Sequence, residues 1–170
     1  GAVQANLTQL GLADLGSFSG GGGDTSAVDS TGVAELFFAN RPMHMARWPN
    51  LFANESIQWA YTGSGVPHNC TTACTGFQWK SAPPNVAKWA EEVRTRQPYL
   101  HGYWTWDWRD GYTPMTGVDA SAGVISVSDP TLLPKVGLGA RWHTINMLCE
   151  LDQPSEYYIA RNSSDAGMLY

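Results

Sequence analysis

The run most able to do chemistry in this sequence is residues 101–110, HGYWTWDWRD. In an extended strand successive side chains alternate between faces, so Trp104, Trp106 and Trp108 share one face and Asp107 lies on the other. A row of flat indoles can stack on sugar rings, with Asp107 and Arg47 as candidates to contact the hydroxyl groups. The row can equally fill a core, because each buried Trp removes about 150–250 Å² from water. We expect at least two of the three indoles to be in the core, and carbohydrate contact is the alternative.

Carboxylate pairs are the next candidates for catalysis. The pairs that are close in sequence are Asp107 with Asp110, Glu150 with Asp152, and Glu91 with Glu92. A glycosidase needs two carboxyl groups about 5–9.5 Å apart across a cleft, and proximity in sequence does not supply that arrangement. No serine lies in a Gly-x-Ser-x-Gly elbow. The sequence therefore predicts no catalytic residue and no cofactor site.

The three cysteines indicate an oxidising compartment. Cys70 and Cys74 enclose a five-residue loop, and a local disulfide there is worth about 2 kcal/mol by loop entropy. A metal site built on this pair, with His68, would lack a second ligand pair at a recognised spacing, so no metal site is predicted. Cys149 lies among apolar residues, which favours a buried inert thiol over a bond to another chain.

Asn-x-Ser/Thr sequons occur four times, at Asn6, Asn54, Asn69 and Asn162. This number exceeds the one or two expected by chance, and each sequon lies in an expected loop or strand end. Together with the cysteine pair, the sequons predict an extracellular, secreted glycoprotein. The first residues have no basic region and no long apolar stretch, so we expect a mature form or a piece of a larger protein.

The composition limits the other classes of function. The chain has 170 residues, of which 43% are hydrophobic and only 15% charged, unlike a disordered segment or a coiled coil. Its net charge is −5 and it has no run of Lys and Arg, so nucleic acid and anionic membranes are not expected partners. No apolar run approaches the ~18 residues of a membrane span.

The elements that would position these residues are mostly strands. Alternating segments predict strands near residues 1–10, 34–38, 43–48, 75–80, 100–108, 112–118, 123–128, 156–160 and 168–170. Hairpin turns are expected at Asn40 and at 119–122, and one helix over 85–94, between Pro83-Pro84 and Pro98. Residues 19–32 form an expected glycine-rich loop, residues 50–75 an expected long excursion, and residues 141–151 fit strand or helix. The prediction is a single mainly β domain over 1–170, a β-sandwich or barrel-like fold with one short helix and long loops.

Several blocks of the chain resemble one protein family. They are residues 36–50, residues 101–108 (HGYWTWDW), residues 146–158, and Gly167, Leu169 and Tyr170 near the end. These blocks look like those of secreted right-handed parallel β-helix proteins of the pectate-lyase-like superfamily, which includes glycoside hydrolases. Ser155 and Tyr157 stand where the family has Gly and Trp, and residues 51–80 look like a local elaboration. The resemblance implies a β-rich domain inserted among the coils of the helix.

Two functions follow as hypotheses. The resemblance implies a noncatalytic domain that binds polysaccharide or supports a glycoside hydrolase or lyase, since the coils that carry the family's catalytic carboxylates are absent here. The alternative is a structural subunit of an extracellular assembly or fibril that self-associates through exposed strands such as residues 3–10.

Overall fold

The fold is that of a computed structural model, which describes residues 3–12, 14–15, 35–67, 70, 74–128, 136, 138–161 and 164–170. Within these residues the chain is mainly β, with one α-helix and one short 3-10 helix. The prediction of a mainly β, barrel-like fold with one short helix is confirmed. None of the described helices is long and apolar enough to cross a membrane.

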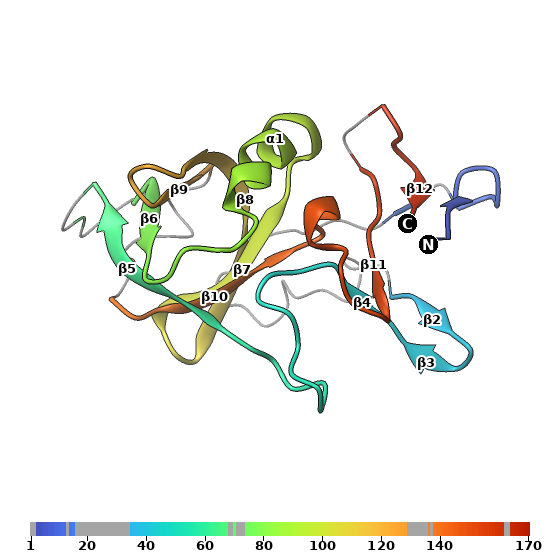
Figure 1. The fold of residues 1–170 in the computed structure, drawn as a ribbon, viewed down its shortest axis with the longest axis horizontal. Coiled ribbons are helices and arrows are strands. Elements are labelled where there is room, and N and C mark those ends of the chain that lie inside the picture. The colour runs from blue at the N-terminus through green and yellow to red at the C-terminus, as the bar shows by residue number, and fades with distance from the viewer. Residues whose placement is uncertain are drawn as a thin grey trace.

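Six antiparallel strands close into a barrel (Figure 1). They are β5 (Ala60–Val66), β6 (Gly76–Trp79), β7 (Tyr99–Trp106), β8 (Arg109–Asp119), β9 (Val124–Val127) and β10 (Arg141–Ile145). The order around the barrel is β10, β5, β6, β9, β8 and β7, and β7 pairs with β10 again. Alternate side chains of each strand therefore face the interior or the outer surface.

Helix α1 (Val86–Arg96) packs beside β8. It begins just after Pro83 and Pro84, whose fixed backbone suits a helix start, and ends at Gln97, which has a left-handed φ of 52°. Pro98 then prevents continuation. The predicted helix is confirmed, and its Trp89 is fully buried.

Short strand pairs lie beside the barrel and carry both described chain ends (Figure 1). In sequence order, β1 (Ala5–Asn6) pairs with β12 (Met168–Leu169), β2 (Phe37–Phe38) with β3 (Arg41–Pro42), and β4 (His44–Met45) with β11 (Glu156–Tyr157). The β4–β11 pair is parallel. The β2–β3 turn uses Ala39 and Asn40 in left-handed conformation, which confirms the turn predicted at Asn40, whereas the strand predicted over 43–48 is β4 and pairs with β11.

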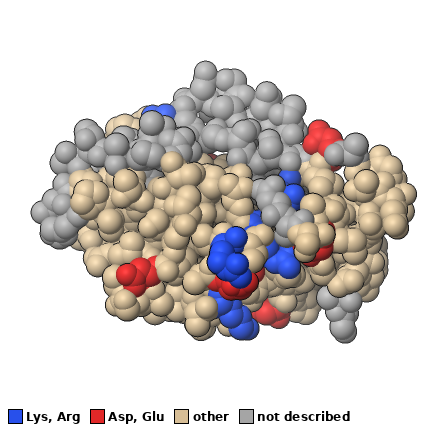
Figure 2. All heavy atoms as spheres, turned by 90° about the horizontal axis from the view of Figure 1, so that it is seen from above, with Lys and Arg blue, Asp and Glu red and all other residues tan. Residues whose placement is uncertain are grey.

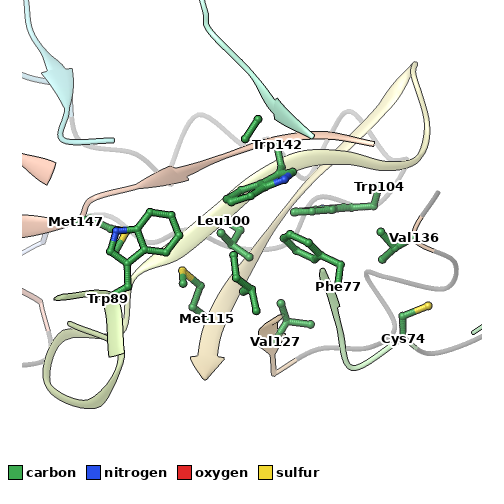
Figure 3. Close-up of a cluster of buried hydrophobic side chains, with 12 residues drawn as sticks. Cys74, Phe77, Trp89, Leu100, Trp104, Met115, Val127, Val136, Trp142 and Met147 are labelled. Atoms are coloured by element: carbon green, nitrogen blue, oxygen red, sulfur yellow. The ribbon is translucent and has the colours of Figure 1, made fainter. Parts of the chain in front are cut away.

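The core of the barrel is unusually rich in indole rings (Figure 3). Trp142 and Trp104 lie against Phe77, with ring centroids 5.1 and 5.5 Å from that of Phe77. A Cβ on Gly102 would come within 2.8 Å of the Arg141 carbonyl oxygen and 3.0 Å of the Trp104 ring. Glycine at this position therefore lets strand β7 approach β10 closely enough for the large rings to fit.

Some element predictions were wrong or incomplete. The excursion predicted over 50–75 contains strand β5, and the strand predicted over the first ten residues is only the two-residue β1. The ambiguous segment 141–151 holds both structures, β10 and the 3-10 helix η1 (Leu148–Glu150). The predicted hairpin around 119–122 is confirmed as β8 and β9. The predicted glycine-rich loop over 19–32 lies outside the described residues.

Charged side chains of both signs lie together on the face in Figure 2, with uncharged residues around them. Two ion pairs are Glu91 with Arg94 on α1, at 2.7 Å, and Arg96 with Asp165, at 3.0 Å. On the described part of this face, positive and negative groups are therefore interspersed. The predicted absence of nucleic acid and membrane partners stays a prediction.

Candidate functional site

A cleft of about 450 Å³ lies where four chain segments meet at the outer surface of β5. Its aromatic walls are Trp48, Trp59 and Tyr61. The lining also contains amide, carboxylate and ammonium groups, from Asn50, Gln58, Lys80, Glu150, Asp152 and Gln153. Trp59 and Tyr61 flank the inward-facing Ala60, so both side chains take the outer face by alternation. Flat rings beside amides and carboxylates form a lining that can hold a polar ligand with flat apolar faces.

Arg47 fixes the shape of this cleft from behind. Its Nε donates to the Pro49 carbonyl at 2.9 Å, and its Nη2 donates to the Gln58 carbonyl at 3.1 Å. The two bonds tie one wall segment to the other. The residue is buried, and burial lowers the pKa of its guanidinium to about 10. Arg47, a candidate for carbohydrate contact from sequence, therefore positions cleft residues and does not face solvent.

The polar lining of the cleft contains two carboxylates, one with both oxygens in hydrogen bonds and one exposed to solvent. Glu150 accepts from Trp89 Nε1 at 2.6 Å and from Asn85 Nδ2 at 3.2 Å, and burial raises its pKa. Asp152 is exposed and accepts from Asn50 Nδ2 at 2.9 Å. The Asn50 Oδ1 is buried and has no hydrogen-bond partner among the described residues. That orphaned acceptor marks the Asn50 side of the cleft as a place for a ligand donor.

An aromatic strip continues from the cleft across the outer face of the barrel. We use this name for Trp59, Tyr61, Arg141 and Tyr103 on the outer face, together with the exposed pair Trp106 and Trp108 at the tip of the β7–β8 hairpin, which is joined to Arg141 only through Asp107. Arg141, opposite Tyr61 in the β10–β5 register, places its guanidinium 4.0 Å from the Tyr103 ring and 5.5 Å from the Trp59 ring. Tyr103 of β7 and Trp59, which directly precedes β5, thus hold the Arg141 cation of β10 between two aromatic rings.

The strip reaches the tip of the β7–β8 hairpin through Asp107. Arg141 Nη2 donates to the Asp107 carbonyl at 3.0 Å, and the two side chains approach to 3.8 Å. At this tip Trp106 and Trp108 are stacked, with centroids 5.4 Å apart and planes 18° apart. They are 44% and 74% exposed.

The expectation that at least two of the three indoles lie in the core was wrong. Trp104 alone is buried, at 3% exposed, and its Nε1 donates to the Gly111 carbonyl at 3.0 Å. Trp106 pairs with Arg109 across the turn, so Trp108 belongs to the turn and not to a strand. The proposed common face of the three indoles ends there, and Trp104 is placed away from any surface ligand.

Beside Trp59, two buried histidines form a hydrogen-bonded chain with a half-buried carboxylate. His101 Nε2 is hydrogen-bonded to Asp110 Oδ2 at 2.8 Å, and His101 Nδ1 to His143 Nε2 at 2.9 Å. His143 Nδ1 meets the Thr144 carbonyl at 2.8 Å. Burial lowers the pKa of both histidines.

The remaining predicted sites have mixed placements. The Cys70–Cys74 disulfide is confirmed, and Cys149 is a free thiol whose pKa burial raises to about 12. Asn54 is exposed, and its Oδ1 accepts from the Ser56 hydroxyl at 2.6 Å. Asn6 lies in β1, while Asn69 and Asn162 lie outside the described residues.

The sequence reasoning missed Trp59, Tyr61, Arg141 and the histidine pair as site residues. The alternation of Trp59 and Tyr61 about Ala60 is a weak strand signal, and it falls inside the long excursion predicted over 50–75. Arg141 and His143 alternate in the same way, yet only barrel closure places them beside residues of β5 and β7.

Comparisons with protein-family models, with curated proteins and with solved structures found no match. The resemblance to secreted β-helix proteins therefore stays a prediction. Among the described residues, no group of three His, Cys, Asp or Glu side chains is arranged to hold a metal ion.

Proposed function

We propose that the chain is a noncatalytic carbohydrate-binding domain of an extracellular protein related to the β-helix polysaccharide enzymes. The observation that carries this proposal is the aromatic strip leading into a cleft lined by amides and by the exposed Asp152 carboxylate. Sugar rings have apolar faces that stack on indoles and phenols, and equatorial hydroxyl groups that need donors and acceptors at the edges. The strip supplies aromatic rings for the apolar faces, and the cleft supplies donors and acceptors for the hydroxyl groups.

Contacts within the protein already fix the side chains of the strip before a ligand binds. Arg141 is fixed by two rings and by the Asp107 carbonyl, so binding would order few new side-chain rotamers. Arg47 holds the two walls of the cleft from inside. A preorganised surface loses less conformational entropy on binding, which favours useful affinity from a modest contact area.

Binding is favoured over hydrolysis by the state of the Glu150–Asp152 pair. Glu150 is only 1% exposed, and both its carboxylate oxygens already accept hydrogen bonds from Trp89 and Asn85. A general acid must reach the leaving-group oxygen, and this carboxyl is directed into the protein. The disulfide and the exposed Asn54 sequon support an extracellular setting.

The test is affinity electrophoresis against soluble laminarin, xylan, xyloglucan and polygalacturonate, with pull-down on cellulose and chitin. We expect retention by at least one polysaccharide, and a loss of about fivefold to a hundredfold in affinity for Trp59→Ala and for Trp108→Ala. Phe38→Ala is the matched control, because Phe38 is 74% exposed but lies on the β2–β3 hairpin, away from the strip. Equal retention of all three variants, or no retention by any glycan, would contradict the proposal.

Self-association is a second candidate, favoured by the apolar groups at the other end of the molecule. Phe37 and Phe38 on the β2–β3 hairpin are 60% and 74% exposed, and Val3 and Leu10 are also exposed. Sedimentation of the native chain and of a Phe37→Ser, Phe38→Ser double variant tests it. A concentration-dependent oligomer that the double variant abolishes would support association, and a native chain that stays monomeric would exclude it.

A further inference from the structure

The His101–His143–Asp110 chain has a definite requirement for protons. A carbonyl oxygen can only accept, so His143 Nδ1 must carry the hydrogen that meets Thr144. The bond between His101 Nδ1 and His143 Nε2 needs one hydrogen, and the bond between His101 Nε2 and Asp110 needs another. All three bonds form together only when the two rings and the carboxyl share three protons.

Losing or gaining one proton breaks a bond in this chain. With two protons, either the two ring nitrogens meet as bare lone pairs, or His101 Nε2 faces an ionised carboxylate without a hydrogen. With a fourth proton on the rings, two N–H groups oppose each other. The three-proton state carries one positive charge, shared between the rings and balanced by Asp110, or it is neutral with the proton on Asp110.

Aromatic rings enclose the shared charge. The Trp59 ring lies 5.2 Å from the His143 ring and 5.9 Å from the His101 ring. Tyr112 stacks on His101 at 4.5 Å, and Tyr103 contacts it edge-on at 6.0 Å. A cationic imidazole beside these rings strengthens their packing, because an aromatic face attracts a cation. Trp59 is therefore best supported in the three-proton state.

Other ionisable groups also act on this chain. Arg47, from the segment after β4, is close enough to lower the pKa of both histidines, whereas Asp110 on β8 raises that of His101. Arg141 on β10 also lies over the Trp59 ring, with its guanidinium 5.5 Å from the ring centroid. Glu156 on β11 lies near Arg47 and has its own pKa near 7, so it is a separate source of pH dependence that an experiment must exclude.

We propose that the His101–His143–Asp110 chain is a proton-controlled support for Trp59, which makes glycan binding stronger in mildly acidic surroundings than in neutral ones. The pH dependence of glycan affinity rests on the proposed function of the aromatic strip. The pH dependence of the Trp59 environment does not rest on it. As the pH rises, the third proton leaves and one hydrogen bond of the chain is lost. The histidine rings that pack against Trp59 are then held less firmly. Because the glycan binds the state in which all three bonds are formed, binding at the higher pH must restore the lost bond, which corresponds to about a fivefold loss of affinity.

The decisive variant is Asp110→Asn. An asparagine amide can donate to a bare His101 Nε2, so neutral His101 can donate from Nδ1 to His143 and all three bonds persist with two ring protons. Because burial lowers the pKa of both histidines, histidine ¹⁵N spectra and the Trp59 indole N–H resonance of the full chain are followed from about pH 4 to pH 8. In the native protein we expect one linked titration that moves both rings and the Trp59 signal. In Asp110→Asn the Trp59 signal should stay near its acidic position.

The affinity of the chain is then measured at both ends of this pH range. The ligand is the polysaccharide that retains the chain in electrophoresis, among laminarin, xylan, xyloglucan and polygalacturonate. We expect the native chain to weaken about fivefold at the higher pH and Asp110→Asn to keep its acidic affinity. Glu156→Gln and His44→Gln are controls that should keep the native pH dependence. If Trp59 responds to pH but no glycan binds, the support stands and the proposed function fails. If a glycan binds without pH dependence, or Trp59 titrates with Glu156 instead, the support is refuted and the proposed function survives.

Discussion

Replacing the tryptophans of the β7–β8 hairpin one at a time should separate core from surface. Trp104 is 3% exposed, and burying about 200 Å² of ring is worth roughly 5 kcal/mol at 25 cal/mol per Å². Residual burial in the unfolded chain lowers this figure, while the lost bond to the Gly111 carbonyl and the cavity add to it. We therefore expect Trp104→Ala to lower the free energy of unfolding by about 4 kcal/mol. Trp108→Ala, at a position 74% exposed, should cost less than about 1 kcal/mol.

The assay is urea unfolding followed by far-ultraviolet circular dichroism, which does not depend on which indole has been removed. Trp104→Phe, with an expected loss of about 2 kcal/mol, keeps the comparison open if Trp104→Ala does not fold. Trp106→Ala should fall between the two extremes because its ring is 44% exposed. A Trp108→Ala variant as unstable as Trp104→Phe, or a Trp104→Ala variant as stable as the native chain, would refute the assignment of inside and outside.

Three further outcomes are expected. The pKa of Glu156 is raised from 4.5 to about 7, chiefly by burial, so the folded state holds this proton more tightly and stability should fall as pH rises through 7. Allowing for solvent screening of the half-buried carboxyl, the loss between about pH 5 and pH 8 should be about 1–2 kcal/mol in thermal unfolding, and Glu156→Gln should flatten the curve. Replacing Cys70 and Cys74 together by serine should cost about 2 kcal/mol, measured by urea unfolding, and no change under reducing conditions in the native chain would contradict this. Expression in a secreting eukaryotic host should add a glycan at Asn54. The intact mass should show loss of this glycan in Asn54→Gln, whereas the matched control Asn50→Gln should keep it.

The elements found from sequence are those with strong local signals. Proline on both sides predicted α1, and turn residues at Asn40 and at 119–122 predicted two hairpins. Strand β5 had no such signal, because Gly63, Ser64 and Gly65 in its centre are poor strand formers. Its pairing with β6 and β10 imposes the extended conformation, and pairing between distant segments is not visible in a single sequence.

The tryptophan row shows where a periodicity argument stops. Alternation correctly separates His101 and Tyr103 from Trp104, which lie on opposite faces of β7. It fails at Trp108 because Asp107 and Trp108 form the turn between two paired strands. The pattern of residue types is the same whether the strand continues or turns, so only the pairing of Trp106 with Arg109 decides the fate of the third indole.

The candidate site depends on barrel closure more than on any one motif. Tyr61, Arg141 and Tyr103 come from β5, β10 and β7, which are far apart in the chain and adjacent only because the sheet closes. The interior that allows this closure is filled by Trp104, Trp142 and Phe77, and Gly102 lets the strands approach around them. Loss of binding in an interior variant would therefore report a broken barrel and not a lost contact. Trp59 and Trp108 lie outside that interior, so their replacement tests the binding surface while the barrel that builds it remains intact.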